Sequence, residues 1–431
     1  MNQEAVLETN MLKSSFKRNY FLLMLGRTIS EIGTSIFKFG LSLYVLDVTK
    51  SAFAYSMVLF FSTMAGVITN VFAASISDKY NKKNIMIISD ILSAIVICIF
   101  SILCGRILNS MIILIVYVII ISSIQSLFEL TISSAIPNLF CEDDITKVNS
   151  SLQSILSLLG IFGAIVGSFI YSSFGITTIL IIDGVSFGIT GLMEMFLIYK
   201  DDKRAVEFQK EKKYINNIKE IFMFFKQNST LIFLVIFVMI TGLVFGSLVL
   251  LVLPYITYNE LNLSSLEVSL IQAGWFIGTI LGAILVSKYN ALSNIMKKIF
   301  LFLAIQSVSV MFWVFPNILN SNSVSNWVIT GVYMTLLIIL GIFNSYQIIP
   351  ITTFFQIYIP TEIRARFFGI FNASILIASS LGNCIYGILL ENFNWSIIIF
   401  ISGIITIVYA LFGRKGKKFG KYSELIDSIN V

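Results

Sequence analysis

The sequence has no histidine and very little charge: Lys and Arg number 29 and Asp and Glu 23 among 431 residues. Without histidine, a zinc site of the usual kind or a His-based catalytic triad is excluded. The four cysteines (Cys98, Cys104, Cys141 and Cys384) form no CxxC pair, and we interpret them as small buried apolar residues. No GxxxxGK[ST] loop is present to bind ATP. We expect neither a metal nor a cofactor.

Apolar residues are present in excess. They make up 57% of the chain, and only 12% of residues are charged, whereas soluble domains have about 45–50% and about 25%. The chain is therefore predicted to be an integral membrane protein. Its first apolar stretch is long, carries charges and lacks a small-residue cleavage site, so we do not expect it to be removed as a signal peptide.

A spanning helix needs about 20 apolar residues, and twelve such segments can be drawn. They are residues 20–47, 51–76, 84–104, 111–136, 148–173, 175–199, 229–257, 266–289, 295–316, 326–350, 366–390 and 394–413. The least certain boundary separates the fifth and sixth segments, where only Ser173-Phe174-Gly175 serves as a turn. A total of eleven or thirteen helices is also compatible with this pattern.

The basic residues predict the orientation. With both termini in the cytoplasm, 25 of the 29 Lys and Arg residues fall in cytoplasmic segments, and only Lys50 and Arg106 lie in outer loops. Cytoplasmic loops are normally enriched in Lys and Arg. The net charge of +6 thus reflects membrane topology, and we expect no nucleic-acid partner.

The chain is predicted to divide into two halves. A polar segment, residues 200–228, is expected to contain an amphipathic surface helix and separates the six-helix bundles 1–199 and 229–431; a plain solvated linker is the alternative. Lys-Tyr-Asn follows the second and the eighth segment at an offset of 209 residues, and the fifth and eleventh share glycine-spaced faces. Such parallel duplication is a known transporter plan, with the substrate bound between the halves near the bilayer midplane.

Ionisable residues interrupt the first segment. At about 100° per residue, Arg27, Glu31, Thr34, Lys38 and Ser42 fall on one stripe about 80° wide. A charge at the bilayer centre costs at least about 2.5–3.5 kcal/mol unless it meets water or a partner, so this stripe is predicted to line the transport path. Glu31 either binds a proton or cationic substrate, or forms only a structural ion pair with Arg27.

Three of the other acidic residues inside predicted spans can be assigned a role. Glu129, in the fourth, is either a second carboxylate of the cavity or a group that reaches the inner interface. Asp183, eight residues into the sixth, is a third candidate for the cavity. Asp90 lies only about a turn and a half inside the third, where a local structural role is favoured over transport.

Four segments, in order, resemble the major facilitator superfamily: the first is similar to its signature loop, and the other three resemble its drug and siderophore exporter branch, which includes macrolide efflux proteins. They are AASISDKYNKKNIMIISD (73–90), SSAIPNLFCEDDITKVNS (133–150), LIIDGVSF (180–187) and FQIYIPTEIRARFFGIFNA (355–373). The resemblance implies an all-α fold of twelve transmembrane helices in two bundles. It also implies a gating loop, for which the residues are Asp78, Lys82, Lys83, Asp90, Arg364 and Arg366.

The leading hypothesis is an alternating-access exporter of lipophilic or amphiphilic small molecules in the cell membrane, driven by proton antiport and acting as a monomer. A siderophore exporter and a lysophospholipid carrier of the same fold are alternatives. A membrane-embedded lipid-linked enzyme is disfavoured, because the external loops are short and carry no histidine, DxD or Ser-His set.

Overall fold

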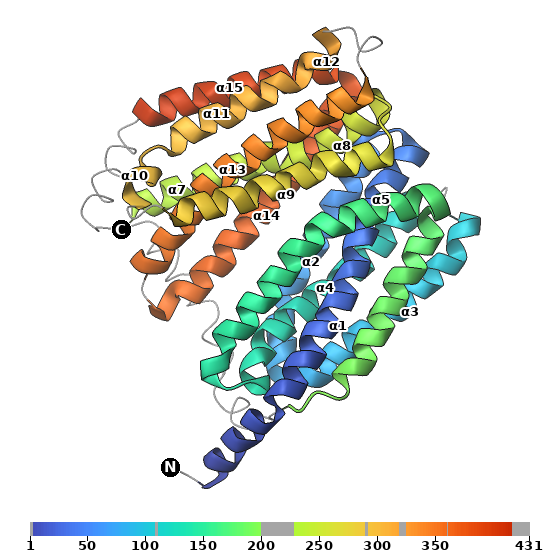
Figure 1. Ribbon diagram of the computed structural model, residues 1–431, viewed down its shortest axis with the longest axis vertical. Coiled ribbons are helices and arrows are strands. Elements are labelled where there is room, and N and C mark those ends of the chain that lie inside the picture. The colour runs from blue at the N-terminus through green and yellow to red at the C-terminus, as the bar shows by residue number, and fades with distance from the viewer. Residues whose placement is uncertain are drawn as a thin grey trace. The chain divides into compact units, whose positions relative to one another are not determined.

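The computed structural model describes residues 3–107, 111–199, 228–288, 292–318, 325–359 and 361–415. Helices account for almost all of this part of the chain, and it contains no strand (Figure 1). The predicted all-α fold is confirmed. The chain packs as two compact units, unit 1 (1–49 and 57–211) and unit 2 (50–56 and 212–431).

Unit 1 is built from long helices. They are α1 (Gln3–Thr49), α2 (Ala52–Lys79), whose first residues belong to unit 2, α3 (Lys82–Ile107), α4 (Met111–Leu139) and α5 (Glu142–Glu194). α5 contains two apolar passes, because Gly175 has φ 77° and ψ −178° and interrupts the helical path. The turn predicted at Ser173-Phe174-Gly175 is therefore a kink at the glycine.

Unit 2 contains the remaining helices. They are α7 (Ser229–Thr241), η2 (Gly242–Gly246), η3 (Leu248–Val252), α8 (Leu253–Tyr255), η4 (Ile256–Glu260), α9 (Ser265–Ser287), α10 (Leu292–Met296), α11 (Ile299–Met311), η5 (Phe312–Val314), α12 (Phe315–Ile318), α13 (Asn326–Tyr358), α14 (Thr361–Asn392) and α15 (Trp395–Lys415). The elements from α7 to η4 form one apolar span, Thr230–Glu260, with π-helical turns at η2, η3 and η4.

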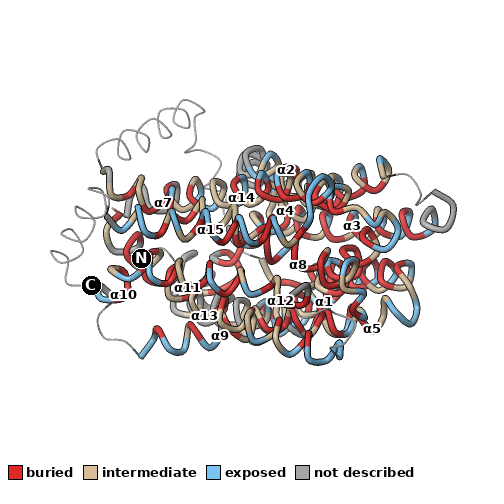
Figure 2. Tube along the Cα trace, turned by 90° about the horizontal axis from the view of Figure 1, so that it is seen from above, coloured by how far each residue is buried: buried red, intermediate tan, exposed pale blue. Residues whose placement is uncertain are grey.

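Ten segments of the described residues are long and apolar enough to cross a membrane. One of them, Leu158–Glu194, contains the kink at Gly175, and a shorter apolar helix covers Ile299–Val314. Counting both passes of α5 and this short helix gives the predicted twelve. Exposed positions recur along the helices in Figure 2, and many of them carry large apolar side chains such as Phe21, Ile102 and Phe412, as expected for a surface that faces lipid.

Small residues bring helices into close contact at matching places in the two units. In unit 1 a Cβ on Gly163 would collide with Ser35, and one on Gly167 would stand 3.0 Å from the Ile36 carbonyl oxygen of α1. In unit 2 a Cβ on Gly382 of α14 would collide with the Leu243 carbonyl oxygen of η2. The glycine-spaced faces noted in the fifth and eleventh segments thus have the same role: each lets the first span of its unit pack without an intervening side chain.

The predicted surface helix in residues 200–228 lies, apart from Asn228, outside the described residues. The boundaries 1–199, 200–228 and 229–431 therefore stay a prediction.

Candidate functional site

Arg27 is at the centre of a charged cluster in unit 1, the Arg27 cluster, which it forms with Glu31 and Glu129. Its Nη2 atom donates a hydrogen bond to Glu129 Oε1 of α4 at 2.6 Å and lies 2.7 Å from Glu31 Oε1, one turn further along α1. The guanidinium carbon lies 5.3 Å from the centre of the Phe128 ring. One buried cation therefore joins two carboxylates from two helices and rests on an aromatic face.

The three side chains differ in exposure. Arg27 is 8% exposed, Glu31 15% and Glu129 53%. The spacing along α1 predicts that Arg27 and Glu31 share a stripe, and the structure places them in contact. Glu129 and Arg27 come from different helices, and the packing of α4 on α1 brings them together.

The rest of the α1 stripe extends towards Asp183 in the second pass of α5. Asp183 is fully buried, and the side chain of Thr34 on α1 interacts with its carboxyl group. The charges of Lys38 and Glu31 act on it. A Cβ on Gly33 would stand 2.9 Å from Asp183 Oδ1, so the carboxyl group packs directly against the α1 backbone. Thr34 is buried beside this contact, and Lys38 is exposed.

Asp90 of α3 and Glu194 at the end of α5 form a second group of acidic side chains. They are 1% and 4% exposed, and Asp90 Oδ2 and Glu194 Oε2 have no hydrogen-bond partner among the described residues. The charge of Asp90 acts on Glu194, and the charge of Arg27 acts on both. Glu194 escapes prediction from the sequence, although it is an acid five residues before the predicted end of the sixth span.

Polar side chains from other helices fix the chain that follows Glu194. Lys83 Nζ donates to the carbonyl oxygens of Met195 and Leu197, both at 2.8 Å, and Arg18 Nη2 donates to Phe196 O at 2.6 Å. Asn19, fully buried, exchanges hydrogen bonds with the backbone of Ile198. Cations at a helix C-terminus satisfy its free carbonyl groups, so the end of α5 is firmly held.

Of the other predicted gating residues, the structure describes the side chain of Lys82 alone. Lys82 is half-buried at the first turn of α3. The side chains of Asp78, Arg364 and Arg366 lie outside the described residues. A gate formed by these residues stays a prediction.

Unit 2 contributes uncharged polar groups. Gln347 Nε2 of α13 donates to Gln306 Oε1 of α11 at 2.9 Å, and Gln306 Nε2 donates to Leu340 O at 3.1 Å. Both amides are buried. Among its described apolar spans, the acidic residues Glu260, Glu267 and Glu391 all lie near helix ends, and Glu267 is buried there.

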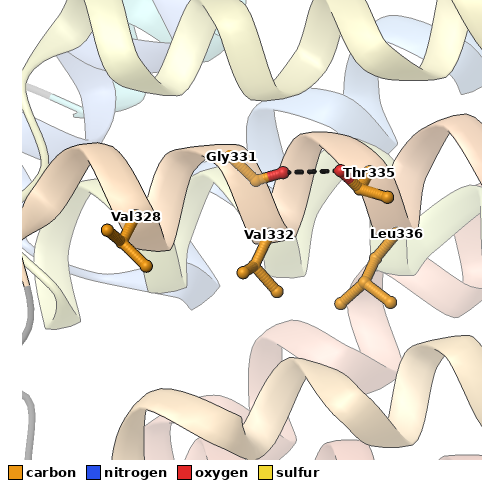
Figure 3. Close-up of a pocket in the computed structure, with 5 residues that line it drawn as sticks. All are labelled: Val328, Gly331, Val332, Thr335 and Leu336. Atoms are coloured by element: carbon orange, nitrogen blue, oxygen red, sulfur yellow. Dashed lines mark hydrogen bonds between the residues drawn. The ribbon is translucent and has the colours of Figure 1, made fainter.

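A cavity of about 380 Å³ lies along α13 (Figure 3). Val328, Gly331, Val332, Thr335 and Leu336 line it, and the Thr335 hydroxyl is already donated to Gly331 O at 2.8 Å. It offers no charged group, so we do not assign it a part in transport.

The Arg27 cluster combines one permanent cation with two acids. Arginine stays protonated at any physiological pH, so only its acidic partners can change charge. Among the described residues no group of three or more His, Cys, Asp or Glu side chains is arranged to hold a metal ion.

Known proteins are similar to this chain in sequence or in fold. The chain is 25% identical over 250 residues to the MFS-type transporter YkuC of Bacillus subtilis (strain 168), covering 56% of each protein; it spans little more than half of that relative. It is 22% identical over 293 residues to macrolide efflux protein A of Streptococcus pyogenes, covering 68% of this chain and 71% of that protein.

Solved structures with the same fold include the nucleoside transporter NupG, with a TM-score of 0.70 and 14% identity over 92% of this chain and 98% of that one. A D-xylose-proton symporter has a TM-score of 0.68 and 13% identity, with 91% and 97% covered. The Major Facilitator Superfamily profile matches residues 23–372 and 247–418. Together with the membrane spans, this match shows that the chain belongs to the Major Facilitator Superfamily and is a multi-pass transporter of the cell membrane.

Proposed function

We propose that this transporter is an exporter of lipophilic or amphiphilic compounds, driven by exchange for protons, in which Glu31 binds the proton. The main support for the proposal is that Arg27 contacts both Glu31 and Glu129. The depth of Glu31, close to the middle of the span Ser15–Thr49, supports the same assignment.

Two acids around one cation make Glu31 able to change charge at low cost. When Glu31 is ionised, the three groups together carry one net negative charge, which attracts a proton or a cationic substrate. When Glu31 takes up a proton, Arg27 keeps its hydrogen bond to Glu129, so no unpaired cation is left buried. A single pair of Arg27 and Glu31 would lack this property.

The substrate class is inferred from composition and from a relative. Aromatic residues make up 14% of the chain, and unit 2 keeps its acidic residues at helix ends, so apolar contacts dominate there. The chain is similar over most of its length to macrolide efflux protein A. The name of that protein refers to the efflux of macrolides. A large amphiphile fits these features better than a sugar or an inorganic ion.

The test uses the purified protein in liposomes with an imposed pH gradient and a macrolide as the transported probe. Glu31→Gln keeps the side-chain shape and removes the ionisable group, so pH-driven accumulation should fall to the level of protein-free liposomes, whereas exchange without a gradient should persist. Asp47→Asn is the matched control: Asp47 is an exposed acid on α1, away from the Arg27 cluster, and its replacement should leave pH-driven transport unchanged.

Each part of the proposal can fail separately. Normal pH-driven accumulation in Glu31→Gln would show that Glu31 has only a structural role. Transport of a siderophore or a lysophospholipid in place of the macrolide, with the same dependence on Glu31, would retain the coupling mechanism and replace the substrate class.

A further inference from the structure

Asp90 and Glu194 lie together on neighbouring helices, apart from the contacts made by Glu31 and Glu129. α3 packs on α5 where a Cβ on Gly191 would stand 3.3 Å from Asp90 Cβ. Glu194 follows Gly191 by three residues and so lies on the same face of α5. The glycine permits the close approach that places the two carboxyl groups in one buried region.

Each acid has one oxygen with no hydrogen-bond partner in the described part of the chain, although both side chains are at least nine-tenths buried. Lys83, the basic side chain bound next to this region, is engaged with the carbonyl oxygens of Met195 and Leu197. A buried carboxylate with an unsatisfied oxygen is costly, and two such charges side by side repel each other. A proton shared between the groups removes both costs.

We propose that Asp90 and Glu194 hold one proton between them and form a second proton-binding site, coupled to Glu31 through Arg27. This proposal extends the proton-exchange function proposed above, but the presence of the shared proton does not depend on it. Asp90 is subject to the charges of Arg27 and Glu31 from α1, of Glu129 from α4 and of Glu194 from α5.

The coupling has a definite sign. An ionised Glu31 repels a second negative charge and so helps to keep the proton on the pair of Asp90 and Glu194. When Glu31 takes up a proton, that repulsion disappears and the attraction of Arg27 favours an ionised Asp90. Uptake of a proton at one site therefore promotes release at the other, which is the property of a relay.

Infrared spectroscopy of the purified protein in lipid tests the pair directly, because a protonated carboxyl group has its own C=O stretching band. All samples carry Asp183→Asn, since Asp183 is another fully buried carboxyl group and could contribute its own band. At neutral pH the parent should show a protonated-carboxyl band. It should be absent from the variant that also carries Asp90→Asn and Glu194→Gln, and it should be retained when Asp47→Asn is added instead.

Further variants keep the proposal falsifiable if the double replacement does not fold. Glu194→Gln alone should weaken the band and move the pH at which it disappears downward, because Asp90 then no longer faces the charge of Glu194. Glu31→Gln should keep the band and move the pH at which it disappears downward by roughly one unit. An unchanged spectrum in the variants of the pair would overturn the shared proton, whatever the transport assay shows. A midpoint that is unchanged in Glu31→Gln would overturn the coupling.

Discussion

At the scale of single residues, the permanent charge of Arg27 organises the acids around it. Its guanidinium group contacts two carboxylates and the Phe128 ring at once. A lysine could not reproduce this geometry, because an ammonium group lacks the planar arrangement of donors. Glu31 and Glu129 therefore share one cation that never titrates in the physiological range.

Removal of that side chain should cost more than removal of either partner. Arg27→Met should destabilise unit 1 by about 3 kcal/mol, because Glu31 is left buried without its cation. Glu129, half exposed, can be hydrated instead. The measurement is the midpoint of thermal unfolding in detergent, followed by tryptophan fluorescence.

The double variant Arg27→Met with Glu31→Gln provides the control. It should recover part of the lost stability, since the uncompensated buried charge has been removed along with its partner. If the double variant were no more stable than Arg27→Met alone, packing against Phe128 rather than charge would account for the role of Arg27.

Helical spacing is sufficient to predict which residues of α1 share a face, because the angle between positions is fixed by the helix itself. It places Arg27 and Glu31 together, and depth within the predicted spans nominates Glu129 and Asp183. Spacing along one helix cannot show that Arg27 contacts Glu129 as well as Glu31, because the contact with Glu129 depends on which helices pack together. Glu194 escapes prediction for a related reason: an acid near the end of a span usually reaches water, and here the anchored segment 195–198 keeps it buried.

At the scale of helices, Gly175 divides α5 into two apolar passes. Its φ of 77° and ψ of −178° lie in a region that is essentially restricted to glycine. A Cβ built at this position meets no atom within 4 Å. The requirement for glycine is therefore set by the backbone alone, and the sequence indicated the turn by the tripeptide Ser173-Phe174-Gly175.

Gly175→Ala should lower the stability of unit 1 by about 1–3 kcal/mol through backbone strain. Gly331→Ala is a matched control, because a Cβ at Gly331 also meets open space but the residue lies within the regular helix α13. That control should be neutral or slightly stabilising. Equal unfolding midpoints for the two variants would contradict the proposed strain.

At the scale of the whole molecule, the two units pack their first spans in a similar way but differ in their buried polar residues. Both use glycines to press their first span against a partner span, Gly163 and Gly167 in unit 1 and Gly382 in unit 2. The spans of unit 1 contain the buried ionisable residues Arg27, Asp90, Asp183 and Glu194, whereas Gln306 and Gln347 form a buried amide pair in unit 2. The sequence reveals the duplication because small residues at close helix contacts recur at regular spacing. Contacts between larger side chains of different shapes leave no such regular pattern.

The predicted orientation in the membrane requires certain segments of unit 1 to lie on the same side. Arg18, Lys83 and the segment 195–198 meet at one end of unit 1. That meeting agrees with a topology in which the N-terminal segment and the connections after the second and sixth spans lie on one side. With 25 of the 29 basic residues assigned to this side, the positive-inside rule predicts that it is the cytoplasm.

Labelling in intact cells tests this orientation. In a parent whose four cysteines have been replaced, single cysteines at Lys50 and Asn322 should react with a membrane-impermeant maleimide from outside, because both positions follow an odd-numbered span. A cysteine at Lys213, between the sixth and seventh spans, should react only after the cells are opened. Reaction at Lys213 in intact cells, with protection at Lys50 and Asn322, would reverse the topology. The end of unit 1 that holds Asp90 and Glu194 would then face outward, and the proposed relay would receive its protons from the opposite compartment.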